Sequence, residues 1–535
     1  MRATVPGTLR VLALGVLGGL LTLALGPCLR WAMGDEGRRA MLSTTAWQAP
    51  VLGNTLVLGV GQAVLVTWLA GLLAAVQNLC FPGRRLLHIV VLTPLVTPAW
   101  TMALGLVMLL GNSGLLRSLM PGGLDVYGLP GLVLAGSLQV LPFAYLAMLA
   151  AERSVDAQLL DQARMLGLDQ KRARRQVAWP RLLPATAATA LVVFVEAITD
   201  LANPAVLGGG YPVLASRVHL AVSAEYDLAG AAMLALLLAV PALLLHLAAR
   251  PLGGRGRFRL LRSGTPAPRH VPSPGEWSMV FLAVLVGLVQ VLVLGAVLLG
   301  SVASSIGVDA QPTTAYLRQA LRGAHGEAFG YGLLLALLAL PVTGTAAMVI
   351  ALAAHGRGRL ARLVRMAAWS LGALPGLLVG LSVMLVVHTA QGHKWSGGPF
   401  GWVTAVAIIM VHVLRSLPAV VTALLARLDL EPRVTRDAAR LHGVGLWRRL
   451  RVHWWPQLAP ELGRGLCTSL LRTLGAVGSV VFLTNSHVGL LSVRALTEVD
   501  AGRVGAACAM AVWLAAVGCL VLAVCHPVLG AREED

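Results

Sequence analysis

The sequence predicts an all-α membrane protein in which about twelve transmembrane helices form two pseudo-symmetric halves of six spans each. Three observations support this fold class. The mean hydropathy is +0.78, and 57% of the 535 residues are hydrophobic while 12% are charged, which exceeds what a soluble core requires. Apolar runs long enough to cross a bilayer recur along the chain. A polar segment occurs twice, 276 residues apart.

Each expected span is an apolar run long enough to cross about 30 Å of hydrocarbon at about 1.5 Å per residue. In the first half the runs lie near 9–29, 51–78, 88–111, 129–151, 182–206 and 228–249. In the second half they lie near 278–301, 330–354, 366–389, 401–426, 465–485 and 503–526. The first run is expected to be a retained span, because GPCLRWAMG is a poor signal-peptide cleavage site.

The distribution of basic residues predicts the orientation of the spans. With a cytoplasmic N-terminus, about 30 Lys and Arg fall in cytoplasmic segments and about 10 in outside loops. We therefore expect both termini in the cytoplasm. The Pro-, Gly- and Arg-rich stretch 251–277 indicates a cytoplasmic linker between a first half, 1–250, and a second half, 278–535. The net charge of +19 is dispersed between apolar runs, so we expect no nucleic-acid partner.

The repeated polar segment reads DQARMLGLDQKRARRQVAWP in the first half and DAARLHGVGLWRRLRVHWWP in the second. In each copy an acid is followed by Ala, Gly and Pro at the same spacing. Glycine permits a turn with positive φ, and proline suits the start of a new helix. The pattern predicts two short helices joined by a tight bend in each half, with these defining residues: Asp161, Ala163, Gly167, Pro180, Asp437, Ala439, Gly443 and Pro456.

This segment resembles the EAA loop of type I ABC importer permeases, whose usual form is E-A-A, three residues, G, nine residues, I, any residue, L-P. The spacing from Gly to Pro matches in both copies, whereas Asp replaces Glu in both and Trp replaces Leu at Trp179 and Trp455. The alternative is two ordinary amphipathic cytoplasmic loops. The resemblance implies that each loop docks one copy of a separate ABC ATPase subunit.

Further segments resemble the fused, two-half permeases of ferric-iron importers, namely VEAITDLANPAVLGGGYPVLA in the first half and LRTLGAVGSVVFLT in the second. Permeases for 2-aminoethylphosphonate, polyamines and thiamine share this layout. The resemblance implies a multi-pass permease in a bacterial inner membrane, in contact with lipid, with ferric iron as the leading solute. It also implies a periplasmic or lipid-anchored solute-binding protein as a partner.

The sequence lacks the motifs of an enzyme. Neither of its two lysines, Lys171 and Lys394, follows a Gly as a phosphate-binding loop requires, so ATP is expected on the partner subunit. There is no HExxH, no GxSxG and no His cluster at metal-ligand spacing. We therefore expect no catalytic residue, no metal and no cofactor on this chain. The six cysteines show no zinc-binding spacing and are expected to be packing residues.

Four charged residues fall within the expected spans: Glu196, Asp200, Arg415 and Arg472. A charge in hydrocarbon is costly and normally faces a cavity or a partner. The four residues are therefore candidates for lining or gating a transport path. The alternative is a structural ion pair, or a position close enough to a span end to reach water. Glu196 and Arg472 lie 276 residues apart, so the repeat predicts that they face each other across the pseudo-two-fold axis.

A secondary transporter is the rival of another class, because such proteins also often have twelve spans and a central cytoplasmic linker. The major-facilitator form would usually carry a G-x-x-x-D-basic motif after the second span. Here that loop reads QNLCFPGRRLLH and contains no acid. A membrane-embedded enzyme is a third possibility, for which the sequence has no catalytic cluster.

Overall fold

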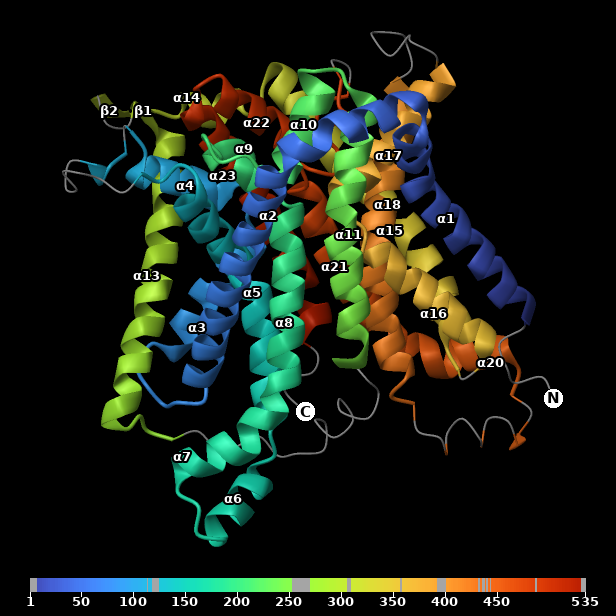
Figure 1. Cartoon of the computed structure of the whole chain (residues 1–535). Helices are drawn as coiled ribbons and strands as arrows, with labels where there is room; N and C mark the ends of the chain where they lie inside the picture. Colours follow the sequence, from blue (N-terminus) through green and yellow to red (C-terminus); the bar gives the residue numbers. More distant parts are fainter. Residues whose placement is uncertain are drawn as a thin grey trace.

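The computed structural model of the chain is almost entirely helical (Figure 1). A two-stranded antiparallel hairpin, formed by β1 (Ala303–Ser305) and β2 (Asp309–Pro312), lies at one end of the bundle. The structure describes residues 7–112, 114–117, 125–252, 270–305, 309–356, 358–391, 401–431, 434, 438, 441–442, 444–485 and 488–530.

The first half contains eleven described helices and two short irregular turns. The helices are α1 (Gly7–Met33), α2 (Asp35–Val76), α3 (Arg84–Leu92), α4 (Thr101–Leu110), α5 (Leu129–Arg153), α6 (Ala157–Met165), α7 (Gln170–Ala173), α8 (Trp179–Thr199), α9 (Ala202–Leu207), α10 (Leu214–Ser223) and α11 (Leu228–Leu252). A 3₁₀ turn, η1 (Thr93–Leu95), precedes α4, and a π-helical turn, η3 (Arg174–Ala178), leads into α8.

The second half follows the same plan. Its described helices are α13 (Pro274–Val302), α14 (Ala315–Gln319), α15 (Gly323–Ala354), α16 (Arg359–Gly372), α17 (Gly376–Gln391), α18 (Gly401–Leu428), α20 (Leu446–Arg449), α21 (Trp455–Leu474), α22 (Leu491–Asp500) and α23 (Val504–Gly530). A π-helical turn, η4 (Leu450–Trp454), leads into α21.

Nine helices within the described residues are long and apolar enough to cross a membrane, and the bent pair α16 and α17 makes a tenth. Three of the twelve expected spans are therefore not single membrane-crossing helices, and one of them, 366–389, is the bent pair α16 and α17. The run 88–111 is divided into α3, η1 and α4 around Pro94 and Pro98, because proline cannot donate a helical N–H. The run 465–485 leaves the helical conformation after Leu474, where α21 ends.

The irregularities repeat in both halves and confirm that the halves share one fold. The 93° break between α16 and α17 corresponds to the break between α3 and α4. The π-helical turns η3 and η4 lie 276 residues apart, as do the first residues of α8 and α21. The linker expected at 251–277 lies mostly outside the described residues, so its role as a domain boundary stays a prediction.

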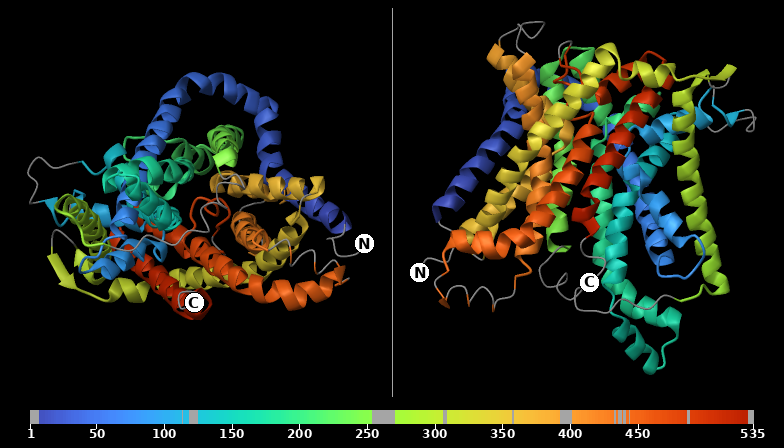
Figure 2. Two further views of the ribbon diagram at one scale, coloured as in Figure 1. Left: turned by 90° about the horizontal axis from the view of Figure 1, so that it is seen from below. Right: turned by 180° about the vertical axis from the view of Figure 1, so that it is seen from behind.

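The first helix of each half packs against the other half. Figures 1 and 2 show α1 beside α16 and α17, and α13 beside α3 and α4. At each of these two contacts, a buried polar side chain donates a hydrogen bond to the other half. On α17, Ser382 Oγ donates to the carbonyl oxygen of Ala24 on α1 at 2.7 Å, and on α13, Gln290 Nε2 donates to that of Val91 on α3 at 3.5 Å. The two halves therefore share one packed core.

The cysteines differ from the expectation that all six are packing residues. Cys28 and Cys508 are buried, as expected, but Cys467 on α21 and Cys525 on α23 form a disulfide bond. The expectation was wrong for this pair because its members are 58 residues apart in the chain and meet only when α21 and α23 pack together. Cys80 and Cys519 are exposed.

Candidate coupling segments and transport path

The first polar segment forms the two short helices and the bend that its sequence predicts. Asp156 caps α6 by accepting a hydrogen bond from the Gln158 N–H at 3.0 Å. Gly167 has a φ of +88°, and Leu168 N–H donates to the Ala163 carbonyl oxygen at 3.1 Å. This is the glycine-dependent end of a helix, in which the left-handed residue returns the chain toward α7. The expected bend at Gly167 is confirmed, and its role in ATPase coupling stays a prediction.

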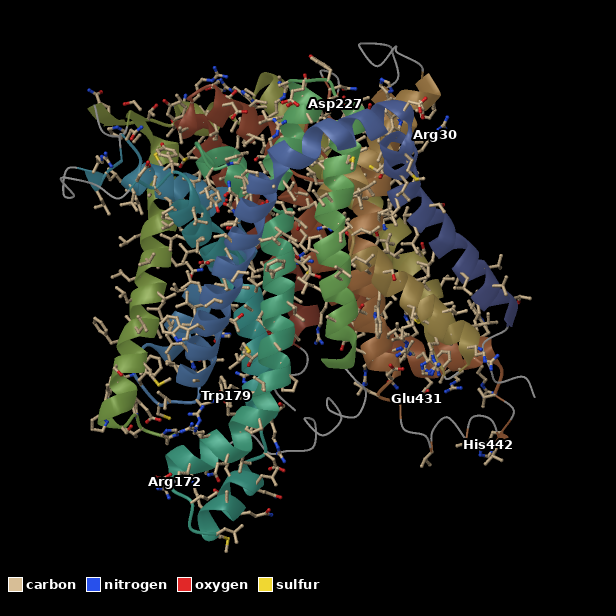
Figure 3. All side chains as sticks on the ribbon, viewed as in Figure 1. Arg30, Arg172, Trp179, Asp227, Glu431 and His442 are labelled. Atoms are coloured by element: carbon tan, nitrogen blue, oxygen red, sulfur yellow. A yellow bond between two sulfur atoms is a disulfide. The ribbon has the colours of Figure 1, made fainter. Side chains whose placement is uncertain are left out.

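The tip of this segment exposes apolar side chains. Met165 is 88% exposed and Leu166 is 85% exposed, whereas Ala163 is buried. Figure 1 shows α6 and α7 projecting beyond the end of the bundle, and Figure 3 labels Arg172 on this projection. Large apolar groups that project into solvent are typical of a protein interaction site.

Asp161 and Pro180 have different local roles. Asp161 lies inside α6 and forms an exposed ion pair with Arg164 at 3.3 Å, so the acid that caps the helix is Asp156 and not Asp161. Pro180 is the second residue of α8, directly after the π-helical turn η3. Pro456 has the same place in α21.

The second polar segment is described only in part. Asp437, Ala439 and Gly443 lie outside the described residues, so their expected roles stay predictions. The part that leads into α21 is described, and it also presents large apolar groups to solvent: Trp447 is 74% exposed and Val452 is 68% exposed.

Glu196 and Arg472 meet across the two halves, as the repeat predicts. Arg472 Nη2 lies 3.3 Å from Glu196 Oε1, and the Arg472 guanidinium also lies 5.0 Å from the centre of the Phe143 ring. The side chains are 52% and 41% exposed, so the pair is not enclosed. Whether the pair lines a transport path stays a prediction.

Arg415 has a structural partner at the break in its own half. Its Nη1 donates to the Leu374 carbonyl oxygen at 3.2 Å, between α16 and α17. The equivalent residue of the first half, Gln139, donates to the Pro94 carbonyl oxygen at 3.2 Å, between α3 and α4. A broken span frees backbone carbonyl groups, and these side chains satisfy them. Sequence reasoning missed Gln139 because it carries no charge.

Asp200 serves the short helix α9 rather than a charged partner. Its Oδ1 accepts from the Ala202 N–H at 2.9 Å, and its Oδ2 accepts from the Asn203 side-chain amide at 2.7 Å. A carboxylate at the start of a helix is stabilised by the free N–H groups there. The structure therefore gives Asp200 a local backbone role, and whether it also lines the path stays a prediction.

Apolar and small residues of the two halves pack closely in the segments that follow α8 and α21. Leu201, Val477 and Val480 are buried where the segments after α8 and α21 meet. A Cβ atom on Gly478 would stand 3.4 Å from Leu201 Cβ, and one on Gly475 would stand 3.2 Å from Pro98 Cα. Sequence reasoning missed these residues because they look like ordinary apolar span residues.

No group of three or more His, Cys, Asp or Glu that could hold a metal ion occurs in the part of the chain that the structure describes.

Comparison with protein families gives one match that covers most of the chain. The family described as "Binding-protein-dependent transport system inner membrane component" matches residues 49–255 and 345–534. The two matched ranges correspond to the two structural halves.

Individual relatives are distant but extend over most of the chain. The ferric transport system permease protein FbpB of Actinobacillus pleuropneumoniae is 24% identical over 86% of this chain and 69% of its own length. The thiamine transport system permease protein ThiP of Brucella abortus is 23% identical over 85% of this chain and 82% of its own length. ThiP of Escherichia coli K12 is 26% identical over 82% of each chain.

Proposed function

Because the chain belongs to the family of binding-protein-dependent transport system inner membrane components, we propose that it is the fused permease of an ABC importer for ferric iron. As a permease component, the chain is not an enzyme and needs no cofactor of its own. The family works with ATPase and binding-protein partners. Membership of this family also decides against a secondary transporter.

The first docking segment, residues 156–178, carries the proposal. Its Gly167 bend presents Met165 and Leu166 beyond the bundle, where an ATPase subunit of the partner complex can cover them. The segment continues through η3 into α8, which bears Glu196. A movement of the ATPase is thus connected to the charged pair by one continuous length of chain. The second docking segment, residues 429–454, leads in the same way into α21 and Arg472.

We assign Glu196 and Arg472 a role in closing the transport path in one conformation. Their contact joins the two halves, so a relative rocking of the halves would break it. Arg415 and Asp200 complete the proposed path region. Both termini are proposed to be cytoplasmic, on the side of the docking segments, with two ATPase copies bound there.

Ferric iron is the leading solute because of the likeness to the ferric permease and the segments quoted above. Thiamine is the main alternative, since the ThiP proteins cover more of their own length. Importers of 2-aminoethylphosphonate and polyamines remain further alternatives within the same class.

The test expresses the chain with the ATPase and binding protein encoded beside it, in cells that lack their own importer. Uptake of radiolabelled ferric iron, but not thiamine, is the expected result. Gly167→Val should abolish uptake while ATP hydrolysis continues, because a β-branched residue is strained at positive φ. Gly330→Val on α15 is the control, since that glycine lies outside both docking segments and has an ordinary φ and open space around it. Unchanged uptake in Gly167→Val would overturn the docking role.

A further inference from the structure

The second docking segment is closed at its base by a buried ion pair. Arg449 Nη2 lies 2.7 Å from Glu431 Oε1 and 2.8 Å from Glu431 Oε2, and both side chains are only 4% exposed. Glu431 follows α18, and Arg449 precedes η4 and α21. The pair therefore joins the two ends of the docking segment. The Arg449 guanidinium also stacks on the Trp454 ring, 4.4 Å from its centre.

Two histidines complete the surroundings of the Glu431 carboxylate. His453 Nε2 lies 3.2 Å from Glu431 Oε1, and His355 Nε2 lies 3.7 Å from Oε2. The His355 ring also meets the edge of the Trp454 ring, with centroids 5.8 Å apart. His355 follows α15, so the base of the docking segment is fixed to a membrane-spanning helix.

The same cluster extends to α16 and to α1. Arg365 on α16 donates to Asp429 at 2.7 Å and to the Ala354 carbonyl oxygen at 3.3 Å. Arg10 on α1 donates to the carbonyl oxygens of Ala353 and His355, both at 3.3 Å. These carbonyl groups lie at the end of α15, where a helix leaves its last acceptors without intrahelical partners. Figure 3 labels Glu431 at this end of the bundle.

The first half has a looser counterpart. Glu152, near the end of α5, lies 3.5 Å from Arg174 Nη2, and the Asn78 side-chain amide approaches it at 3.4 Å. The Arg174 side chain is 35% exposed, against 4% for Arg449. Ion pairs weaken as water reaches them, because the effective dielectric constant rises.

We propose that the Glu431–Arg449 pair is a clasp that stiffens the second docking segment, so that this half transmits ATPase movement more rigidly than the first. Glu431 and Arg449 act as positioning residues, since they hold the start of α21 and, through it, Arg472. The effect on transport rests on the proposed function, whereas the difference in stiffness does not.

Hydrogen exchange on the purified full chain in lipid nanodiscs tests the stiffness directly. Amides of 446–454 should exchange more slowly than those of the equivalent segment 170–178. Glu431→Gln should speed exchange in 446–454 by about tenfold, because the unpaired arginine no longer holds the segment. The matched variant Glu152→Gln should change exchange in 170–178 by less than about threefold. Equal changes in the two variants, or no change in Glu431→Gln, would overturn the clasp.

A second variant keeps the test decisive if Glu431→Gln fails to fold. Arg449→Lys retains the charge but loses the stacking guanidinium, and it should speed exchange in 446–454 to an intermediate degree. Normal insertion with wild-type exchange in this variant would contradict the clasp.

The role in transport is measured on the complex with its ATPase. Glu431→Gln should retain the bound ATPase and raise the ATP consumed per solute several-fold, while Glu152→Gln should not. If Glu431→Gln speeds hydrogen exchange but leaves the ATP consumed per solute unchanged, the pair stiffens the segment but does not position α21 for transport. If no ATPase binds the wild-type chain, the proposed function fails, but the exchange result still stands.

Discussion

The two halves repeat their backbone but not their charges. Both have a broken span after their second long helix, and in both a π-helical turn leads into the fourth long helix, α8 or α21. At equivalent places on α8 and α21, however, one half carries Glu196 and the other Arg472. At the base of the docking segments, Glu431 is held tightly by Arg449 where the first half has the looser pair of Glu152 and Arg174.

This difference shows what a fused chain permits. In a dimer of identical subunits, residues that face each other across the two-fold axis carry the same charge and repel each other. On one chain the two copies can diverge, so that equivalent positions become partners. Breaks and turns persist because Pro, Gly and the packing of long helices dictate them, whereas individual side chains can specialise.

The largest expected difference between the halves is in stability. Glu431→Gln leaves Arg449 buried without its counter-charge and should lower the free energy of unfolding by about 3–5 kcal/mol. Glu152→Gln should cost clearly less, because Arg174 can turn toward water. Denaturant unfolding of the two variants in the same detergent measures both values. Equal losses would mean that the halves are equally held at their bases.

The pH dependence of stability should also differ through Glu431. Burial alone would raise the pKa of Glu431, but the nearby His355 and the hydrogen bonds and charge of Arg449 outweigh it and lower the pKa to about 2. A lowered folded-state pKa gives stability that is complete above the unfolded pKa of about 4.5 and is lost as pH falls toward 2. The loss is on the order of 3 kcal/mol. Between pH 6 and pH 2, the melting temperature of Glu431→Gln should fall less than that of the wild-type chain, because the variant has no Glu431 carboxylate to protonate.

A smaller difference is expected at the broken spans. Arg415→Met removes a donor from the Leu374 carbonyl group and should cost about 1–2 kcal/mol. Gln139→Leu should cost less than about 1 kcal/mol, because the Pro94 carbonyl oxygen also accepts a hydrogen bond from Thr97. The melting temperatures of the two variants, compared with wild type, show which substitution costs more stability. A larger loss for Gln139→Leu would show that the two side chains do not serve the same purpose.

The smallest stability effect is expected at the pair that joins the halves. Because Glu196 and Arg472 are half exposed, losing their contact should change stability by under about 1 kcal/mol. Transport is the sensitive readout: Arg472→Glu places two carboxylates together and should reduce solute uptake. Adding Glu196→Arg should restore part of the activity by reversing the pair. A double variant no better than the worse single one would contradict the cross-half contact as a gate.

The sequence by itself determined the features that depend on local chemistry or on the repeat. Composition and apolar runs indicated the membrane class, and the matched segments indicated two halves. Gly167 was predicted at a positive φ because glycine adopts that conformation without a Cβ clash. The contact of Glu196 with Arg472 followed from their common offset, since equivalent residues near a two-fold axis face each other.

Only the tertiary structure decided the features that join residues without a repeat relation. Three such features depend on which helices pack together. They are the packing of α1 and α13 against the opposite half, the Cys467–Cys525 disulfide, and the clasp of Glu431 and Arg449. In the sequence, Glu431 and Arg449 look like two ordinary charges of a basic cytoplasmic loop. Trp454, at the end of η4, and His355, directly after α15, pack against each other beside this pair. Periodicity records which face of a helix is apolar, but it does not record which neighbour covers that face.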